Sequence, residues 1–167
     1  MAAPRPRKQF ALDTNILYDL AEGLDAAHTL REVLQERGAI LQVPLTVIQE
    51  LTHAMLTLKP TEAAVPLRAL QNLQAWGLNA FDLKPVGHGI SQAFCTRLIR
   101  KGHLPEGEEN DGFIVAESAL AEIPVLISRD AHLLDIDAQS LLVELHAADL
   151  SSVQVVHPKV LLASLRR

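Results

Sequence analysis

Residues 10–17 have the sequence FALDTNIL, in which a short apolar run ends abruptly at an aspartate. An amphipathic helical pattern starts two residues after Asp13. This order is typical of a buried strand, expected over residues 9–13, that turns directly into a helix. Open α/β sheets bind their ligands beyond the carboxyl ends of their strands. Asp13 and Asn15 are therefore the first candidate site residues.

The rest of the chain alternates short apolar runs with longer helical patterns. Three further strands are expected at residues 39–43, 125–127 and 153–156. Helical spacing of apolar residues predicts helices near residues 16–24, 27–37, 46–58, 64–76, 90–101, 110–121 and 158–165. Strands that alternate with helices indicate a single α/β domain of three layers, α/β/α, around a mostly parallel sheet.

The spacing of apolar residues does not assign the secondary structure of two segments. Residues 81–86 are compatible with a short strand or with an extended connection, and residues 141–145 form an apolar stretch of uncertain type. Thr46 and Gln49 have the spacing of a capping box, which predicts that a helix starts there. Asn110 is expected to cap the helix that follows it.

Composition narrows the class of protein. The chain has 167 residues, of which 49% are hydrophobic and 21% are charged, as expected for one globular domain. Residues 1–8 form a basic tail and residues 9–167 the predicted domain. Aromatic residues make up only 4%, which argues against a nucleic-acid surface built on base stacking. A single cysteine and the absence of a signal-peptide or membrane-spanning run predict a cytoplasmic protein with no membrane association.

Four acidic residues occupy equivalent places relative to the strands. Asp13 ends the first strand, and Glu50 lies about one turn into the helix after the second. Asp111 starts the helix before the 125–127 strand, and Asp130 follows that strand. Because parallel strands all end at the same edge of a sheet, the four carboxylates are expected to converge there. Other carboxylates close to these positions are Glu108, Glu109, Asp135 and Asp137.

Carboxylates gathered in one crevice repel one another by about 4 kcal/mol per pair at ~4 Å and an effective dielectric constant near 20. Arg129 is the only basic residue adjacent to them in the sequence. Divalent cations would relieve the repulsion, and oxygen ligands without cysteine favour Mg²⁺ or Mn²⁺ over zinc. Such a site can activate water and polarise a phosphoryl oxygen. The expected reaction is hydrolysis of a phosphodiester.

The order of these motifs resembles that of the PIN-domain (PilT N-terminus) nuclease family, in particular its toxin-type, VapC-like members. The resemblance rests on LDTN at residues 12–15, on Glu50, on NDGFIVA at 110–116 and on SRD at 128–130. The segment VVHP at 155–158 is similar to the last strand and helix of the family. The resemblance thus covers nearly the whole chain.

This resemblance implies a PIN-like fold and a metal-dependent endoribonuclease. Asp13, Glu50, Asp111 and Asp130 would be both the catalytic residues and the Mg²⁺ or Mn²⁺ ligands. It also implies that Asn15 and Ser128 support the site. The partners it implies are an RNA substrate, a cognate antitoxin protein if the chain is the toxin of a toxin–antitoxin pair, and a second copy in a homodimer.

Simpler interpretations exist for each residue. Taken singly, Asp13 and Asp111 suit helix N-termini, Glu50 a solvated helix face and Asp130 a turn. Weaker candidates for substrate contacts are Arg129, Arg97 and Lys101, although a solvated helix face also accounts for the last two. His53 and His132 fit surface positions, and Cys95 fits inert packing.

Two other functions remain open at this stage. One is a non-catalytic PIN-like scaffold that binds protein or RNA. The other is a receiver-like, Mg²⁺-binding phosphoacceptor domain, although no lysine clearly takes the place such domains require at the end of a late strand.

Overall fold

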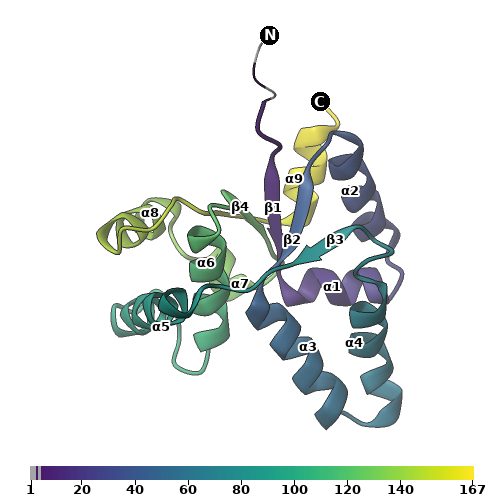
Figure 1. Cartoon of the computed structure of the whole chain (residues 1–167), viewed down its shortest axis with the longest axis horizontal. Helices are drawn as coiled ribbons and strands as arrows, with labels where there is room; N and C mark the ends of the chain where they lie inside the picture. Colours follow the sequence, from purple (N-terminus) through teal and green to yellow (C-terminus); the bar gives the residue numbers. More distant parts are fainter. Residues whose placement is uncertain (1–2, 4) are drawn as a thin grey trace.

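A five-stranded, fully parallel sheet with the order β3-β2-β1-β4-β5 forms the centre of the computed structural model, which describes Ala3 and residues 5–167 (Figure 1). The strands are β1 (Gln9–Leu12), β2 (Ile40–Val43), β3 (Leu78–Ala80), β4 (Val125–Ile127) and β5 (Gln154–Val156). The first strand of the chain is therefore the middle strand of the sheet.

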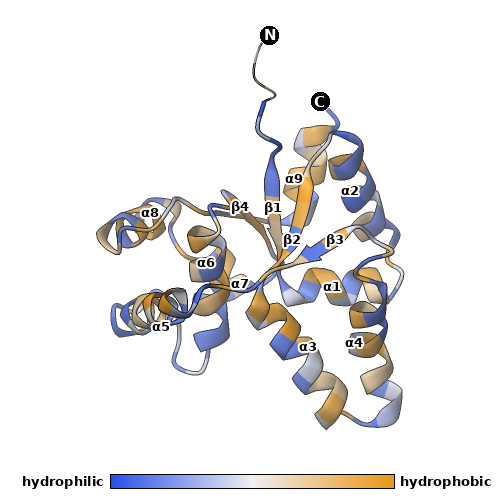
Figure 2. Ribbon diagram, viewed as in Figure 1, coloured by the Kyte–Doolittle hydropathy of each residue, from blue (hydrophilic) through white to orange (hydrophobic). Residues whose placement is uncertain are grey.

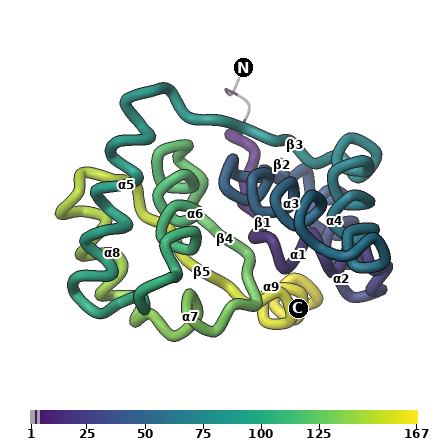
Figure 3. Tube along the Cα trace, turned by 90° about the horizontal axis from the view of Figure 1, so that it is seen from below, coloured from purple at the N-terminus to yellow at the C-terminus, as the bar shows by residue number. Residues whose placement is uncertain are grey.

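Helices connect the strands and cover the sheet on both sides (Figure 3). They are α1 (Thr14–Ala21), α2 (Asp25–Glu36), α3 (Leu45–Thr57), α4 (Pro60–Asn72), α5 (Pro85–Arg100), α6 (Glu109–Leu120), α7 (Ala131–Leu134), α8 (Ala138–Ala147) and α9 (Pro158–Leu165). Among them, α2 packs on α9, α3 on α4, and α6 on both α3 and α5. The predicted three-layer α/β/α architecture is confirmed.

The central strand is almost completely shielded from solvent. Phe10, Ala11 and Leu12 are all buried, as expected for a parallel strand covered on both faces. Leu12 lies opposite Ile127 of β4, and one residue further the Asp13 N–H donates to the Ile127 carbonyl at 3.0 Å. Apolar residues dominate the strands, whereas the helices combine apolar and polar faces (Figure 2). The ladder thus extends to the point where β1 ends, and fixes the position of Asp13.

Some boundaries differ from the expected ones. Strand β3 was not expected, because only Leu78 of its three residues is buried and no apolar run marks it. Residues 81–84 form a connection before α5, and residues 141–145 lie within helix α8.

The two predicted helix caps are wrong. Helix α3 starts at Leu45 after Pro44, so Thr46 lies inside its first turn. The buried Thr46 hydroxyl donates to Glu117 instead of capping its own helix. Asn110 is the second residue of α6 and not its cap. Local spacing suggested both caps, but each helix begins two residues earlier than that spacing predicts.

The amino-terminal residues that the structure describes are exposed. Ala3 and residues 5–8 form no helix or strand, whereas Met1, Ala2 and Pro4 of the predicted tail lie outside the described residues. The division into a tail and a domain stays a prediction. Within the described part of the chain, every helix is too short or too polar to cross a membrane.

Helices α5 and α6 approach each other closely at Gly112. A Cβ atom added to Gly112 would lie 2.8 Å from the Cys95 Sγ atom and 3.2 Å from its backbone Cα. Cβ atoms do not come so close to a backbone atom without displacing it. The absence of a side chain at Gly112 therefore sets the spacing of the two helices, and with it the position of the amino-terminal turn of α6.

We expect Gly112→Ala to destabilise the protein, because the added Cβ would press against the side chain and the backbone of the buried Cys95. Overpacking of this kind costs about 1–3 kcal/mol, or a fall of roughly 2–10 °C in melting temperature for a chain of this size. Gly89→Ala on α5 is the matched control, since no atom lies within 4 Å of its added Cβ. Alanine is the better helix former, so this control should be neutral or slightly stabilising. Thermal melting of both variants checks the prediction, and equal melting temperatures would contradict it.

Candidate functional site

Asp13 is buried and held by three hydrogen bonds at the end of β1, with only 3% of its surface exposed. Its Oδ1 atom accepts from the Thr14 N–H at 2.7 Å, as a helix N-cap does. Its Oδ2 atom accepts from the Ser128 hydroxyl at 2.6 Å and from the Asn15 amide at 3.0 Å. The carboxylate is therefore fixed in one orientation by residues from two neighbouring strand ends.

Asn15 and Ser128, the predicted supporting residues, connect this carboxylate to the loop after β4. The Asn15 amide also donates to the Ser128 hydroxyl at 3.3 Å, and its oxygen accepts from the Arg129 N–H at 3.0 Å. The Ser128 hydroxyl oxygen in turn accepts from the Asp130 N–H at 2.9 Å. The network brings Asp130 to the same edge of the sheet as Asp13.

Glu50 reaches the same region from helix α3. Its Oε1 atom accepts from the Thr14 hydroxyl at 2.7 Å. Thr14 is thus a site residue whose role the sequence did not suggest. The only signal was its place between the aspartate and the asparagine of LDTN. Since Thr14 also donates its N–H to Asp13, it links two of the four predicted carboxylates.

Asp111, in the first turn of α6, is the member of the set with a fully buried oxygen that has no partner. The residue is 7% exposed, and its Oδ2 atom is buried without any hydrogen-bond partner. Burial, followed by the charges of Asp130 and Asp13, raises the pKa of Asp111 to about 8. A buried acceptor without a donor is rare in native structures, because it costs about 1–3 kcal/mol.

The other carboxylates also interact with one another electrostatically. Burial is the main cause that raises the pKa of Asp13 and the pKa of Glu50, against the opposing hydrogen bonds from Ser128 and Thr14. The charge of Asp130 raises both pKa values further. The structure therefore brings the four predicted acids into one electrostatic environment.

No basic side chain neutralises this group within the part of the chain that the structure describes. Arg129, the adjacent candidate, instead forms a two-pronged ion pair with Asp19 of α1, at 2.7 Å from Nε and 2.8 Å from the terminal nitrogen. Its backbone N–H contacts Asn15, but its guanidinium charge is directed to Asp19. Asp19, which the sequence did not indicate, thus anchors the loop that carries Asp130.

The alternative carboxylates are placed less favourably than the predicted ones. Asp137 caps helix α8 through Ser140, and Asp135 is exposed after α7. Glu109 is exposed and accepts from the Gly107 N–H. Glu108 is half-buried, and its charge contributes to the raised pKa of Asp111, so it lies nearest to the site among the four.

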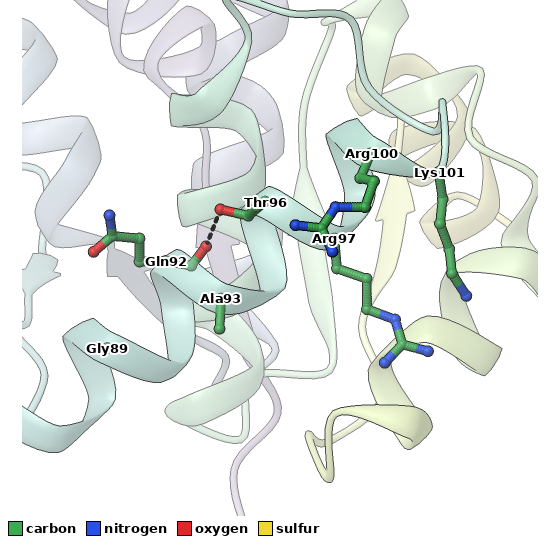
Figure 4. Close-up of a pocket in the computed structure, with 7 residues that line it drawn as sticks. All are labelled: Gly89, Gln92, Ala93, Thr96, Arg97, Arg100 and Lys101. Atoms are coloured by element: carbon green, nitrogen blue, oxygen red, sulfur yellow. Dashed lines mark hydrogen bonds between the residues drawn. The ribbon is translucent and has the colours of Figure 1, made fainter.

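The predicted basic substrate contacts on α5 are engaged elsewhere. Figure 4 shows the side chains of Arg97 and Lys101 at the end of α5. They pair with the two carboxylate oxygens of Glu144 on α8, at 2.5 and 2.8 Å. These ion pairs lower the pKa of Glu144. Arg97, Arg100 and Lys101 line a shallow surface pocket of about 660 Å³. The structure therefore gives Arg97 and Lys101 a contact between helices, and their predicted role with substrate stays a prediction.

The remaining reactive side chains take no part in the acidic group. His53 and His132 are exposed, although the His132 ring lies 3.6 Å from Glu108. Cys95 is buried, its thiol donates to the Glu109 carbonyl at 3.2 Å, and burial raises its pKa to about 11. A thiol with such a pKa is unreactive at neutral pH, as expected for a packing residue.

The donor chemistry of the group fits a hard divalent cation. Within Ala3 and residues 5–167, no three His, Cys, Asp or Glu side chains are placed so that they could hold a metal ion as they stand. The ligand types nevertheless suit Mg²⁺ or Mn²⁺, because all four acids present oxygen atoms and no thiolate or imidazole joins them. The unpartnered Oδ2 atom of Asp111 is the structural feature that a cation would satisfy.

The sequence matches no protein-family model and no curated protein. The fold, however, matches solved structures. One is VapBC2 from Rickettsia felis bound to a DNA fragment from its promoter, at a TM-score of 0.63 and 17% identity, over 89% of this chain and 98% of that chain. A second is DNA-bound VapBC from Salmonella typhimurium, at a TM-score of 0.59 and 14% identity, over 90% of this chain and 98% of that chain. A third is FitAcB from Neisseria gonorrhoeae, at a TM-score of 0.54 and 19% identity, over 90% of this chain and 98% of that chain. The chain shares the PIN-like fold of these structures.

We expect Asp111→Asn to raise the melting temperature of the metal-free protein at pH 8 by a few degrees. The folded pKa of about 8 lies above the ordinary value of 3.8. The folded state therefore holds this proton more tightly than the unfolded state, and the resulting stability is lost as the pH rises from about 4 to about 8. Asparagine carries no charge at any pH, so the variant should lose less stability over this range.

Thermal melting in EDTA between pH 5 and pH 9 measures the effect. Asp135→Asn is the matched control, because Asp135 is exposed and belongs to the alternative carboxylates. Its melting curve should follow that of the wild type. Parallel pH profiles for Asp111→Asn and the wild type would contradict the prediction.

Proposed function

We propose that the protein is a metal-dependent endoribonuclease in which Asp13, Glu50, Asp111 and Asp130 hold Mg²⁺ or Mn²⁺. The observation that carries the proposal is the buried, unpartnered Oδ2 atom of Asp111 beside three other carboxylates without a basic partner. A stable fold gains nothing from this arrangement by itself. A cation bound there would balance the charges and fill the missing contact.

The protein's own residues orient the group. Ser128, Asn15 and Thr14 fix the Asp13 carboxylate, and the Thr14 hydroxyl also orients Glu50. At neutral pH and without metal, Asp111 retains a proton for much of the time, since its pKa is about 8. When bound, the metal supplies a polarised phosphoryl oxygen and an activated water. Because it competes with the proton on Asp111, its affinity should rise with pH.

We further propose that the protein acts as the toxin of a toxin–antitoxin pair, with RNA as its substrate and a cognate antitoxin protein as its partner. The support is the fold shared with chains from VapBC complexes, together with the LDTN, NDG and SRD motifs at the three strand and helix boundaries. A homodimer is part of the same proposal.

The order of the strands disfavours the receiver-like alternative. Receiver domains have the flavodoxin-like strand order 2-1-3-4-5. This sheet has the order β3-β2-β1-β4-β5, in which β1 is central. A non-catalytic scaffold is compatible with the fold, and the experiment below separates it from the nuclease.

We expect the wild type to cleave a mixed RNA pool in Mn²⁺ or Mg²⁺, and Asp13→Asn to lose about 100-fold or more in rate. Metal chemistry of this kind contributes several kcal/mol of transition-state stabilisation. Asp135→Asn controls for the loss of one carboxylate at an exposed position. Cleavage that persists in EDTA, or equal rates for Asp13→Asn and the wild type, would exclude this mechanism; absence of cleavage by the wild type would favour the scaffold.

Metal binding is measurable without any substrate. Mn²⁺ should raise the melting temperature of the wild type, because a ligand that binds only the folded state stabilises it, by about 2.7 kcal/mol at 100 times its dissociation constant. The Asp13→Asn/Asp111→Asn double variant should show little response. A response of equal size in both proteins would place the metal elsewhere.

A further inference from the structure

A second buried carboxylate on helix α6 is not part of the acidic group. Glu117 is 3% exposed and lies six residues after Asp111. Its Oε1 atom accepts from the backbone N–H of Thr46 at 2.8 Å, and its Oε2 atom accepts from the Thr46 hydroxyl. Both partners belong to the first turn of α3, the helix that carries Glu50.

This contact replaces a helix cap that α3 lacks. The residue before the helix is Pro44, which offers no side-chain acceptor, and no side chain of the local sequence caps the turn. The first N–H groups of a helix need acceptors from outside the helix. Glu117 provides one from another helix, and its negative charge also suits the positive end of the α3 dipole.

The arrangement is costly, because Glu117 is buried without a salt bridge and the only charge that favours its ionised form is that of His88. Among the described residues, no lysine or arginine pairs with this carboxylate, and burial raises its pKa. Burying a charge without a salt bridge costs on the order of several kcal/mol, and an apolar contact between two helices would avoid that cost. The two hydrogen bonds offset part of it and, unlike an apolar contact, fix one register between α3 and α6.

The junction is not filled completely by side chains. A pocket of about 220 Å³ lies beside the contact, lined in part by Gln49, His88, Ser91 and Phe113. The Ser91 hydroxyl is buried there and has no hydrogen-bond partner. One side of the Glu117–Thr46 contact faces this space, so its hydrogen bonds add a directional link between the start of α3 and α6 to the apolar packing of Val47.

We propose that Glu117 is a positioning residue of the acidic site, a role that rests on the function proposed above. Glu50 lies one helical turn after Thr46 on α3, and Asp111 lies less than two turns before Glu117 on α6. Because the two helices are joined at this contact, Glu117 fixes the distance between the carboxylates of Glu50 and Asp111. It does not contact the metal or the substrate.

Four variants separate positioning from stability. Glu117→Ala removes both hydrogen bonds, and Thr46→Val removes only the one from the hydroxyl. Glu117→Gln keeps both, because its amide oxygen accepts from the Thr46 N–H and its amide nitrogen donates to the Thr46 hydroxyl. Leu145→Ala is the control for lost stability, since Leu145 is fully buried but lies on α8, which carries none of the four acids.

The measurements are Mn²⁺ affinity by calorimetry, with the metal alone as ligand, and hydrogen exchange of residues 45–50 in EDTA. We expect Mn²⁺ affinity to fall about 5–10-fold in Glu117→Ala and less in Thr46→Val, somewhat below the 10–100-fold typical of groups that contact a metal ligand directly. Glu117→Gln should stay within about twofold of the wild type. Leu145→Ala should lower the melting temperature and leave the affinity unchanged. Exchange at the start of α3 should accelerate only in Glu117→Ala and Thr46→Val.

The outcomes are distinguishable. Unchanged affinity in Glu117→Ala, or an equal loss in Leu145→Ala, would overturn the positioning role and leave the proposed function intact. If Glu117→Ala does not fold, Thr46→Val compared with Glu117→Gln decides in the same way. If the wild type itself binds no Mn²⁺, the proposed function fails and the positioning role fails with it.

Discussion

The repulsion among carboxylates collected at one edge of the sheet is the constraint on which the rest of this structure depends. Bringing them together at buried and half-buried positions opposes folding, and no lysine or arginine of the described residues balances them. The structure limits the cost with neutral donors instead of charges. Ser128, Asn15 and Thr14 donate to Asp13, and the His132 N–H donates to Asp130. Neutral donors fix the orientation of a carboxylate and leave its negative charge available to a cation. An arginine would instead neutralise that charge.

The parallel sheet makes this gathering possible. Asp13 and Ser128 are separated by 115 residues, yet they contact each other because β1 and β4 are neighbours and end at the same edge. The hydrogen bond from the Asp13 N–H to the Ile127 carbonyl continues the ladder to the last residue before the site. The position of the central carboxylate is thus set by backbone geometry, which is stiffer than any side-chain contact.

Features that follow from the spacing of apolar residues along the sequence were predictable. Features that depend on contacts between residues far apart in the sequence were not. The α/β alternation gave the architecture, and the rule for parallel strands brought Asp13, Glu50, Asp111 and Asp130 to one region. The same reasoning missed β3, whose only buried residue is Leu78, and assigned Thr46 to a local cap. It also could not foresee that Arg129 pairs with Asp19, because nothing in either local sequence identifies the other.

Helix α6 carries two buried carboxylates, and their partners distinguish the roles that we propose for them. Both Glu117 oxygens accept hydrogen bonds from Thr46, so that carboxylate is already satisfied within the protein and gains little from a cation. No side-chain hydrogen bond stabilises Asp111, whose Oδ2 atom is buried without a partner, and its pKa is raised to about 8 by burial and by its acidic neighbours. Burial raises the pKa of both groups, so the direction of a pKa shift alone does not separate a structural acid from a ligand. The surroundings do: the unpartnered Asp111 oxygen lies among three other carboxylates, where a cation would satisfy it, whereas Glu117 is held by the Thr46 N–H and hydroxyl.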